Sequence, residues 1–173
     1  MVNLKEDLKK VKAFIFDVDG VFSASEILLH PSGELMRSMN IKDGFALQYI
    51  IKKGYNVGII TGANSESVKI RFQNLGVTDI YMKSYIKMDD FNDFIHKHAL
   101  KPADILYMGD DLPDYDIMKI VGFPACPSDA VEEIKAISKY ISDRPGGEGC
   151  VRDVIEQVLR LHGKWMDEES YRW

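Results

Sequence analysis

The sequence has only two cysteines, Cys126 and Cys150, among its 173 residues. Two thiols so far apart in the chain supply neither the ligands of a zinc ribbon nor the framework of a small disulfide-rich secreted domain. We therefore expect both to be free thiols in a protein of a reducing compartment.

Long apolar runs are absent as well. No stretch reaches the roughly 20 apolar residues that cross a membrane. Residues 1–12 are charged along their length, and the apolar residues 13–16 that follow are too few for the core of a signal peptide. We expect a cytoplasmic protein with no membrane partner.

Positive charge is not in excess. The 22 lysines and arginines face 27 aspartates and glutamates, for a net charge of −5, whereas non-specific binding to nucleic acid needs clustered cations that release phosphate counterions. A nucleic-acid partner is therefore not expected. The 46% of hydrophobic and 28% of charged residues are typical of a globular protein, and the length predicts a single domain over residues 1–173.

Short apolar runs recur along the chain and predict strands. They lie at residues 12–16, 55–60, 79–82, 103–108, 122–126 and 138–142. Between them, apolar residues recur at helical spacing in segments around 47–51, 68–75, 91–98 and 151–161. Asp43 is the predicted N-cap of the first of these helices. The alternation predicts an α/β, three-layer Rossmann-like domain with a mostly parallel sheet.

Residues 25–40, approximately, depart from this alternation. Two short apolar segments flank a tight turn at 31–33 and predict a β-hairpin that projects from the sheet. The C-terminal tail, about residues 163–173, mixes charges with two tryptophans and has no clear period. Two interpretations of the tail stay open, a frayed end or an arm that docks on a neighbouring subunit.

Polar side chains follow four of the predicted strands. They are Asp17 and Asp19, then Thr61 and Gly62, then Lys87, and finally Asp110, Asp111 and Asp114. In parallel α/β sheets, ligands bind at this edge. Two carboxylates about 4 Å apart repel by roughly 4 kcal/mol at an effective dielectric constant of 20, so the cluster requires a cation. Oxygen ligands suit Mg²⁺, which usually also binds a substrate phosphate.

Each acidic motif has a simpler interpretation when taken alone. Residues 17–20, "DVDG", could open a calcium-binding loop, but their glycine comes fourth rather than sixth, and position twelve is Leu28 instead of glutamate. Residues 109–114, "GDDLPD", could be a turn before a capped helix. Their joint occurrence at strand ends, with Thr61 and Lys87 at two others, favours a catalytic site.

Four motifs together resemble those of the haloacid dehalogenase superfamily, in the same order and with workable spacing: "FDVDGVF" at 16–22, "IITG" at 59–62, Lys87, and "GDDLPD" at 109–114. Over about residues 10–163 the chain is further similar to the small, capless phosphatases of that superfamily that act on 3-deoxy-D-manno-octulosonate 8-phosphate (KDO 8-phosphate). Three features narrow the resemblance to this family: "IKDG" at 41–44, Arg71, and "RPGGEGCVRDV" at 144–154.

The resemblance implies a Mg²⁺-dependent phosphatase that acts in the synthesis of lipopolysaccharide precursors. Asp17 would attack phosphorus and form an aspartyl phosphate. Asp19 would protonate the leaving sugar oxygen and then activate the hydrolytic water. The metal would be held by the carboxylates of Asp17 and Asp110 and by the backbone carbonyl of Asp19.

Three further residues are implied to bind the phosphate, namely Thr61, Gly62 and Lys87. The amide of Gly62 is expected at the start of a helix, where backbone amides form an anion site. Asp111 and Asp114 are interpreted as groups that shape the loop or support the metal ligands.

A guanidinium matches a carboxylate bidentately, so arginines are the candidates for binding the sugar carboxylate. They are Arg71 and Arg144, the latter in a loop with Gly146 and Gly147 that is expected to reach the substrate. Arg144 can equally be a plain turn residue, and Arg37 on the hairpin is a weaker candidate.

The stretches from Asp17 to Thr61 and from Thr61 to Lys87 are too short to hold a cap domain. A site without a cap stays open to water unless another chain covers it. This favours a homo-oligomer in which hairpins pack together, and the resembling phosphatases are tetramers.

Three other functions are weighed against this one. A nine-carbon sugar-acid 9-phosphate carries the same carboxylate and primary phosphate, and the chain departs from the family pattern at Ala24 and Ser25, which leaves substrate preference open. A phosphoacceptor signalling domain would place its acceptor aspartate mid-chain, unlike Asp17. An inactive scaffold disagrees with the complete set of motifs.

Overall fold

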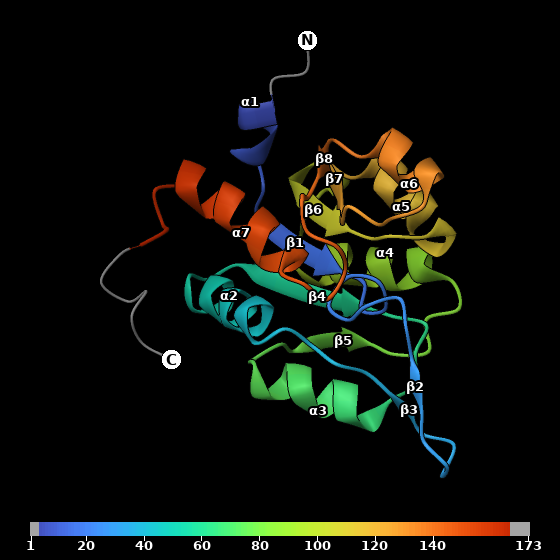
Figure 1. The fold of residues 1–173 in the computed structure, drawn as a ribbon. Coiled ribbons are helices and arrows are strands. Elements are labelled where there is room, and N and C mark those ends of the chain that lie inside the picture. Colours follow the sequence, from blue (N-terminus) through green and yellow to red (C-terminus); the bar gives the residue numbers. More distant parts are fainter. Residues whose placement is uncertain (1–3, 167–173) are drawn as a thin grey trace.

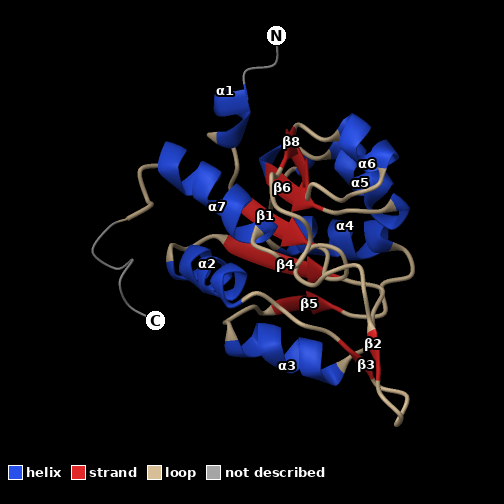
Figure 2. Cartoon of the chain, viewed as in Figure 1, coloured by secondary structure: helices blue, strands red, loops and turns tan. Residues whose placement is uncertain are grey.

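The computed structural model describes residues 4–166, and its centre is a six-stranded sheet in which all neighbouring strands run parallel. The strand order is β5-β4-β1-β6-β7-β8 (Figure 2). The strands are β1 (Ala13–Phe16), β4 (Asn56–Ile60), β5 (Asp79–Tyr81), β6 (Ile105–Met108), β7 (Phe123–Cys126) and β8 (Tyr140–Ile141). Each falls within a run predicted from the sequence.

Continuous apolar runs form these strands because both faces of the sheet are covered. Every residue of β1 is buried, with Phe14 and Phe16 in one apolar core and Ala13 and Ile15 in the other. The opposite orientation of alternate side chains explains this division.

Helices cover both faces and complete three layers (Figure 1). One face packs against α1 (Leu4–Leu8), α2 (Ile41–Lys52), α3 (Glu66–Asn74) and α7 (Cys150–Leu161). The other packs against α4 (Lys87–Lys97), α5 (Tyr115–Ile120) and α6 (Glu132–Ile137). Two short 3₁₀ turns, η1 (Pro102–Asp104) and η2 (Leu112–Asp114), flank β6. The three-layer α/β architecture is thereby confirmed.

The predicted hairpin is present, although its paired part is short. Strands β2 (Leu28–Leu29) and β3 (Leu35–Met36) are antiparallel and separate from the main sheet. They project beyond the body of the domain (Figure 1). In the described residues between β1 and β5 this hairpin, α2 and α3 are the only elements besides β4, so no cap domain lies there.

The predicted N-cap of α2 is wrong. Asn40 caps the helix instead, because its side chain accepts a hydrogen bond from the amide of Lys42 at 2.8 Å. Asp43 lies inside the first turn, fully buried, and accepts a hydrogen bond from the amide of Arg152 at 2.7 Å. The carboxylate therefore caps α7, whose own N-cap residue, Gly149, has no side chain to do so.

Three helices were not predicted, namely the short α1, α5 and α6. Both cysteines are free thiols, as predicted, and the structure shows that both are buried. None of the helices in residues 4–166 is long and apolar enough to cross a membrane.

The first part of the C-terminal tail packs on its own chain. The ring of Trp165 meets that of Tyr49 edge-on, with centroids 5.6 Å apart, and the Tyr49 hydroxyl donates to the carbonyl of Lys164 at 3.0 Å. The rest of the predicted tail, residues 167–173, lies outside the described residues, so the choice between a frayed end and a docking arm stays a prediction.

Candidate active site

An open cavity of about 450 Å³ lies at the carboxyl edge of the sheet. The loops that follow β1, β4, β5 and β6 build it, because the carboxyl ends of parallel strands share one edge. Its lining residues are Asp17, Asp19, Ser25, Thr61, Gly62, Ala63, Ser84, Tyr85, Lys87, Asp110, Asp111 and Pro113. The structure therefore brings six of the sequence-predicted site residues, and Asp111 beside them, into one cavity.

Asp17 follows β1 directly and is held in a fixed orientation. The amide of Val18 donates to its Oδ1 at 2.6 Å, and its Oδ2 lies 2.8 Å from Nζ of Lys87. The residue is only 7% exposed. Burial, and then the charge of Asp114, raise the pKa of Asp17, and the ammonium of Lys87 opposes this rise. The site thus contains a carboxylate whose charge needs further compensation.

Lys87, the first residue of α4, connects two of the acids. Its Nζ lies 2.8 Å from Asp17 and 2.7 Å from Asp114, and the residue is 7% exposed. Burial alone would lower the pKa of this ammonium, but the charges of Asp17 and Asp114 overcome burial and raise it. Lys87 is therefore charged in the site.

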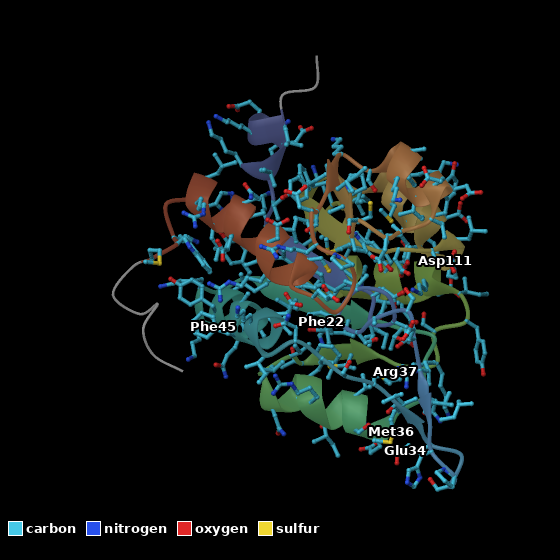
Figure 3. All side chains as sticks on the ribbon, in the orientation of Figure 1. Phe22, Glu34, Met36, Arg37, Phe45 and Asp111 are labelled. Atoms are coloured by element: carbon cyan, nitrogen blue, oxygen red, sulfur yellow. The ribbon has the colours of Figure 1, made fainter. Side chains whose placement is uncertain are left out.

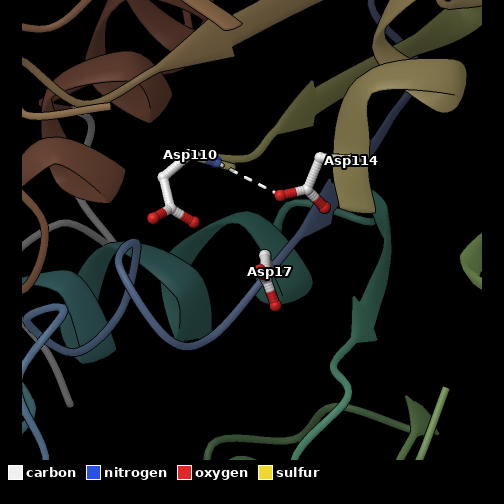
Figure 4. A group of neighbouring side chains, drawn as sticks. All are labelled: Asp17, Asp110 and Asp114. Atoms are coloured by element: carbon white, nitrogen blue, oxygen red, sulfur yellow. Dashed lines mark hydrogen bonds between the residues drawn. The ribbon is translucent and has the colours of Figure 1, made fainter. Parts of the chain in front are cut away.

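Asp110 and Asp114 come from the loop after β6. Oδ2 of Asp114 accepts the amide of Asp110 at 3.2 Å, as Figure 4 shows, and Oδ1 accepts the buried hydroxyl of Tyr107 at 2.6 Å. Burial, followed by the charge of Asp114, raises the pKa of Asp110 to about 7. The carboxylate of Asp110 lies over Gly20, where a Cβ atom would come within 1.9 Å of its Oδ2.

Three carboxylates converge closely enough to share one ion. Asp17, Asp110 and Asp114 each offer an oxygen within 4.8 Å of the others (Figure 4). The Oδ1 atom of Asp110 is buried and, among the described residues, has no hydrogen-bond partner. A buried oxygen without a donor, in a set of oxygen ligands, fits a hard divalent cation such as Mg²⁺.

Asp114 was placed in a supporting role by the sequence, whereas the structure puts its fully buried carboxylate among the three. The only feature of the sequence that could have placed Asp114 beside Asp110 is their separation by four residues. This separation brings two side chains together only if the residues between them form a turn. The turn is η2, which Asp111 initiates by accepting the amide of Leu112 at 2.7 Å.

The side chain of Asp19 lies apart from these three carboxylates. Arg37 donates to both of its oxygens, from Nε to Oδ1 at 2.5 Å and from Nη2 to Oδ2 at 2.9 Å. The hydroxyl of Ser23 also donates to Oδ1, at 3.1 Å. Asp19 nevertheless lines the cavity, so its carboxylate can approach a ligand bound there.

Thr61 and Gly62 also line the cavity, but the predicted helix start at Gly62 is wrong. Helix α3 begins at Glu66, after its N-cap Ser65. The segment does not wind earlier because it is tied to the loop after β5: Lys83 donates its amide to the carbonyl of Ala63, and Ser84 to that of Thr61, both at 3.0 Å. If the amide of Gly62 binds an anion, it therefore does so from a loop and not from the N-terminus of a helix.

The four residues predicted to bind the sugar lie elsewhere in this chain. Arg71 on α3 packs over Gly44, where a Cβ would be 2.5 Å from its Nη2. Arg144 lines a different cavity, of about 420 Å³, which also includes residues from the first turns of α2 and α7. Gly146 and Gly147 are not among the lining residues of the Asp17 cavity.

Gly146 and Gly147 support the loop after β1 instead. The amide of Gly147 donates to the carbonyl of Val21 at 2.9 Å, and a Cβ at Gly146 would be 2.1 Å from the carbonyl oxygen of Gly20. These glycines allow two backbones to touch. Whether they or the two arginines also contact a substrate stays a prediction.

No protein-family model matches the chain. It is similar, however, to the curated 3-deoxy-D-manno-octulosonate 8-phosphate phosphatase of Escherichia coli (strain K12). The two are 33% identical over 160 residues, which cover 92% of this chain and 85% of that protein. The corresponding phosphatase of Salmonella typhi is 32% identical over 160 residues, with the same coverage of each chain.

Solved structures agree. The 3-deoxy-D-manno-octulosonate 8-phosphate phosphatase of Yersinia pestis superposes with a TM-score of 0.91 at 28% identity, covering 94% of this chain and 88% of that one. The enzyme of Moraxella catarrhalis, crystallised with a magnesium ion, a phosphate ion and KDO, gives a TM-score of 0.89 at 31% identity, covering 93% of this chain and 92% of that one.

Proposed function

The chain belongs to the haloacid dehalogenase superfamily and, within it, to the family of 3-deoxy-D-manno-octulosonate 8-phosphate phosphatases; from this premise we propose that it is a Mg²⁺-dependent phosphatase that hydrolyses KDO 8-phosphate to KDO and phosphate. The observation that carries the proposal is the convergence of Asp17, Asp110 and Asp114 on one point beside the ammonium of Lys87. Asp19 stands at the same cavity.

In the first step, an oxygen of Asp17 attacks phosphorus, and the bond from phosphorus to the sugar oxygen breaks. Asp19 gives its proton to that leaving oxygen. In the second step, the carboxylate of Asp19 takes a proton from water while the water oxygen attacks phosphorus. The bond from phosphorus to Asp17 then breaks, which releases inorganic phosphate and regenerates the carboxylate.

The metal is proposed to be held by the carboxylates of Asp17, Asp110 and Asp114 together with the backbone carbonyl of Asp19. A bound Mg²⁺ neutralises charge on the phosphoryl oxygens and so favours attack by an anionic nucleophile. Lys87 supplies a positive charge directly beside the nucleophile, with its Nζ 2.8 Å from Oδ2 of Asp17. Thr61 and Gly62, in the loop after β4, line the same cavity and are proposed to donate hydrogen bonds to the phosphate.

Among the residues that the structure describes, the cavity offers no free cation for the sugar carboxylate. Among the described residues that line it, Lys87 is the only cation, and two carboxylates already surround it. We therefore propose a homo-oligomer, a tetramer as the resemblance implies, in which a second copy covers the open site and contributes a cation such as Arg71 or Arg144. The protein would act in the cytoplasm, in the synthesis of lipopolysaccharide precursors.

One observation keeps a nine-carbon sugar-acid 9-phosphate as the second candidate substrate. Ser25, at one of the two positions where the chain departs from the family pattern, lines the cavity and can contact the sugar. The nine-carbon substrate has one more carbon between its carboxylate and its phosphate, and we propose that this longer sugar would meet the same loop.

A panel of phosphorylated sugar acids tests the proposal. We expect the highest kcat/KM on KDO 8-phosphate, and loss of turnover in EDTA. Asp17→Asn should lower kcat by at least about 10³-fold, because the covalent route is lost, while the fold measured by circular dichroism is kept. Asp116→Asn, an exposed acid on α5, is the matched control. A preference for the nine-carbon substrate, or an active Asp17→Asn variant, contradicts the proposal.

A further inference from the structure

Arg37 makes a two-point ion pair with Asp19 that the proposed mechanism does not use. The side chain of Arg37 is only 5% exposed, whereas that of Asp19 is 34% exposed and borders the cavity. Both nitrogens at one edge of the guanidinium donate to the two carboxylate oxygens. Arg37 is therefore shielded from solvent and does not line the cavity, which Asp19 borders.

The third nitrogen of the guanidinium is also engaged. Nη1 donates to the backbone carbonyl of Leu35 in β3, at 2.7 Å. Arg37 thus joins the return strand of the hairpin to the carboxylate that follows β1. Figure 3 places Arg37 at the end of the hairpin nearest the sheet, with Met36 and Glu34 nearer its tip.

These contacts argue against a role for Arg37 in binding the sugar carboxylate. A carboxylate ligand needs the fork of the guanidinium, and Asp19 already occupies it. Arg37 is not among the residues that line the cavity. What the arrangement does fix is the orientation of Asp19: the hydroxyl of Ser23 holds Oδ1 alone, whereas Arg37 holds both oxygens and so also fixes the plane of the carboxyl group.

We propose that Arg37 is a positioning residue: it orients the carboxyl group of Asp19, which carries its proton on Oδ2 when protonated, for transfer of that proton to the leaving oxygen, and it makes that geometry depend on the hairpin. Among the described residues, Oδ1 accepts hydrogen bonds from both Arg37 and Ser23, whereas Oδ2 accepts one from Arg37 and keeps a lone pair for the proton. The inference rests on the proposed function, because it assigns Asp19 the proton transfer. A planar fork fixes a carboxylate in two directions, whereas a lysine ammonium fixes only a distance.

The leaving group provides the test. A sugar alkoxide leaves with difficulty unless it is protonated as the phosphorus–oxygen bond breaks, whereas p-nitrophenolate leaves without a proton. Arg37→Gln should therefore slow release of the sugar from KDO 8-phosphate by about tenfold or more, within the range of general acid catalysis. Release of p-nitrophenol from p-nitrophenyl phosphate should change less than about threefold. Both rates are measured in a single turnover with excess enzyme, before the second step contributes.

Arg37→Lys keeps the positive charge but not the two-point geometry of the guanidinium. It should therefore slow the two reactions in the same ratio as Arg37→Gln does. Arg160→Gln removes an exposed arginine that pairs with Glu156 on α7, and should leave the ratio of the two rates unchanged. Equal slowing on both esters in Arg37→Lys would overturn the proposal, as would a higher KM at unchanged single-turnover rate.

Failure of the proposed function is recognised separately. If the wild-type protein does not hydrolyse KDO 8-phosphate, the same ratio is measured on whichever primary alkyl phosphate it does hydrolyse. An unchanged ratio in both Arg37 variants then counts against Arg37 alone.

Discussion

Gly20 is the residue on which the acidic cluster depends most directly. Its φ of +84° lies in the left-handed region, and a Cβ there would come within 1.9 Å of the Asp110 carboxylate. We predict that Gly20→Ala displaces Asp110 and weakens Mg²⁺ binding by at least about tenfold, because a ligand that is moved cannot share the ion. Calorimetric titration with Mg²⁺ measures this, alongside kcat.

Gly33 provides the matched control for Gly20. Its φ is +85°, but nothing lies within 4 Å of a Cβ placed there. Gly33→Ala should therefore show only the backbone strain of about 1–2 kcal/mol and keep the affinity for Mg²⁺. Equal Mg²⁺ affinities in the two variants would contradict the prediction, because they would show that the contact of Gly20 with Asp110 does not govern metal binding.

At this same scale, the sequence predicts residues whose position follows from strand ends. Asp17, Thr61 and Asp110 each stand directly after, or two residues after, a buried strand, so one rule brings them to one cavity. Asp114 and Arg37 escape the rule. The position of Asp114 depends on the turn η2, and that of Arg37 depends on where the hairpin folds back. The spacing of apolar residues in the sequence predicts neither conformation.

Among the elements, helix α7 depends on a side chain of α2, because Asp43 of α2 accepts a hydrogen bond from the amide of Arg152 in the first turn of α7. Burial raises the pKa of Asp43 to about 6, although the amides of Arg152 and Gly149 favour its charged form. An unfolded aspartate has a pKa of about 3.9. Between about pH 4 and pH 6 the folded protein therefore binds a proton that the unfolded chain has lost, and the free energy of unfolding falls as the pH rises through this window.

We predict that Asp43→Asn removes this pH dependence. Its amide oxygen can still accept the amide of Arg152, but it does not titrate. We compare the free energy of unfolding of the variant with that of the wild type at each pH. The variant's value minus the wild type's value should rise by up to about 3 kcal/mol from pH 4 to pH 7, since each pKa unit corresponds to about 1.4 kcal/mol. Urea unfolding at several pH values measures the difference. A difference that stays constant with pH would contradict the assignment.

The hairpin exposes an apolar surface that no described part of residues 4–166 covers. Leu28 is 67% exposed and Leu29 is 81% exposed. If hairpins pack together in an oligomer, Leu29→Asp should dissociate it, because the new charge would be buried without a partner. Light scattering after size exclusion measures the mass, and the melting temperature of the monomer should stay within a few degrees.

Ile120→Asp, at an exposed position on α5, serves as the control for the hairpin variant. A wild-type protein that is already monomeric at micromolar concentration, or a Leu29→Asp variant of unchanged mass, would remove the hairpin from assembly.

Elements differ in how well the sequence predicts them, for a physical reason. Strands β1, β4, β6 and β7 are buried along nearly their whole length, so their apolar runs stand out. Helices α2, α3, α4 and α7 are long enough to repeat a helical pattern. Helices α5 and α6 have six residues each, too few for a period. The cap of α2 was misplaced because Asp43 serves a neighbouring helix, and only tertiary structure reveals that.

For the whole molecule, strand order decides where the chemistry lies. β1 is central, with β4 on one side and β6 on the other. After β1 the chain adds β4 and β5 on one side, and it then crosses to add β6, β7 and β8 on the other side. The loops after these strands diverge at that point and leave a cavity between them. Asp17 meets Asp110 and Asp114 there, although both are far from it in the sequence. The repulsion between their carboxylates therefore arises only when the whole domain is folded.

This repulsion makes the stability of the molecule depend on the metal. Because Asp110 is buried beside Asp114 and its pKa is raised to about 7, the metal-free protein at pH 8 keeps an uncompensated charge. We predict that Mg²⁺ at 100 times its dissociation constant raises the free energy of unfolding by about 2.7 kcal/mol, which corresponds to a rise of roughly 5–11 °C in melting temperature at this size.

Asp110→Asn separates this linkage from a general effect of salt. The variant should melt at a higher temperature than the wild type in EDTA at pH 8, because one member of the repelling set is gone, yet it should gain little from Mg²⁺. Asp116→Asn, whose side chain is exposed, should keep the full shift. If all three proteins gain equally from Mg²⁺, the ion stabilises the fold from somewhere other than the three carboxylates, and the site proposed for catalysis is not the one that binds metal.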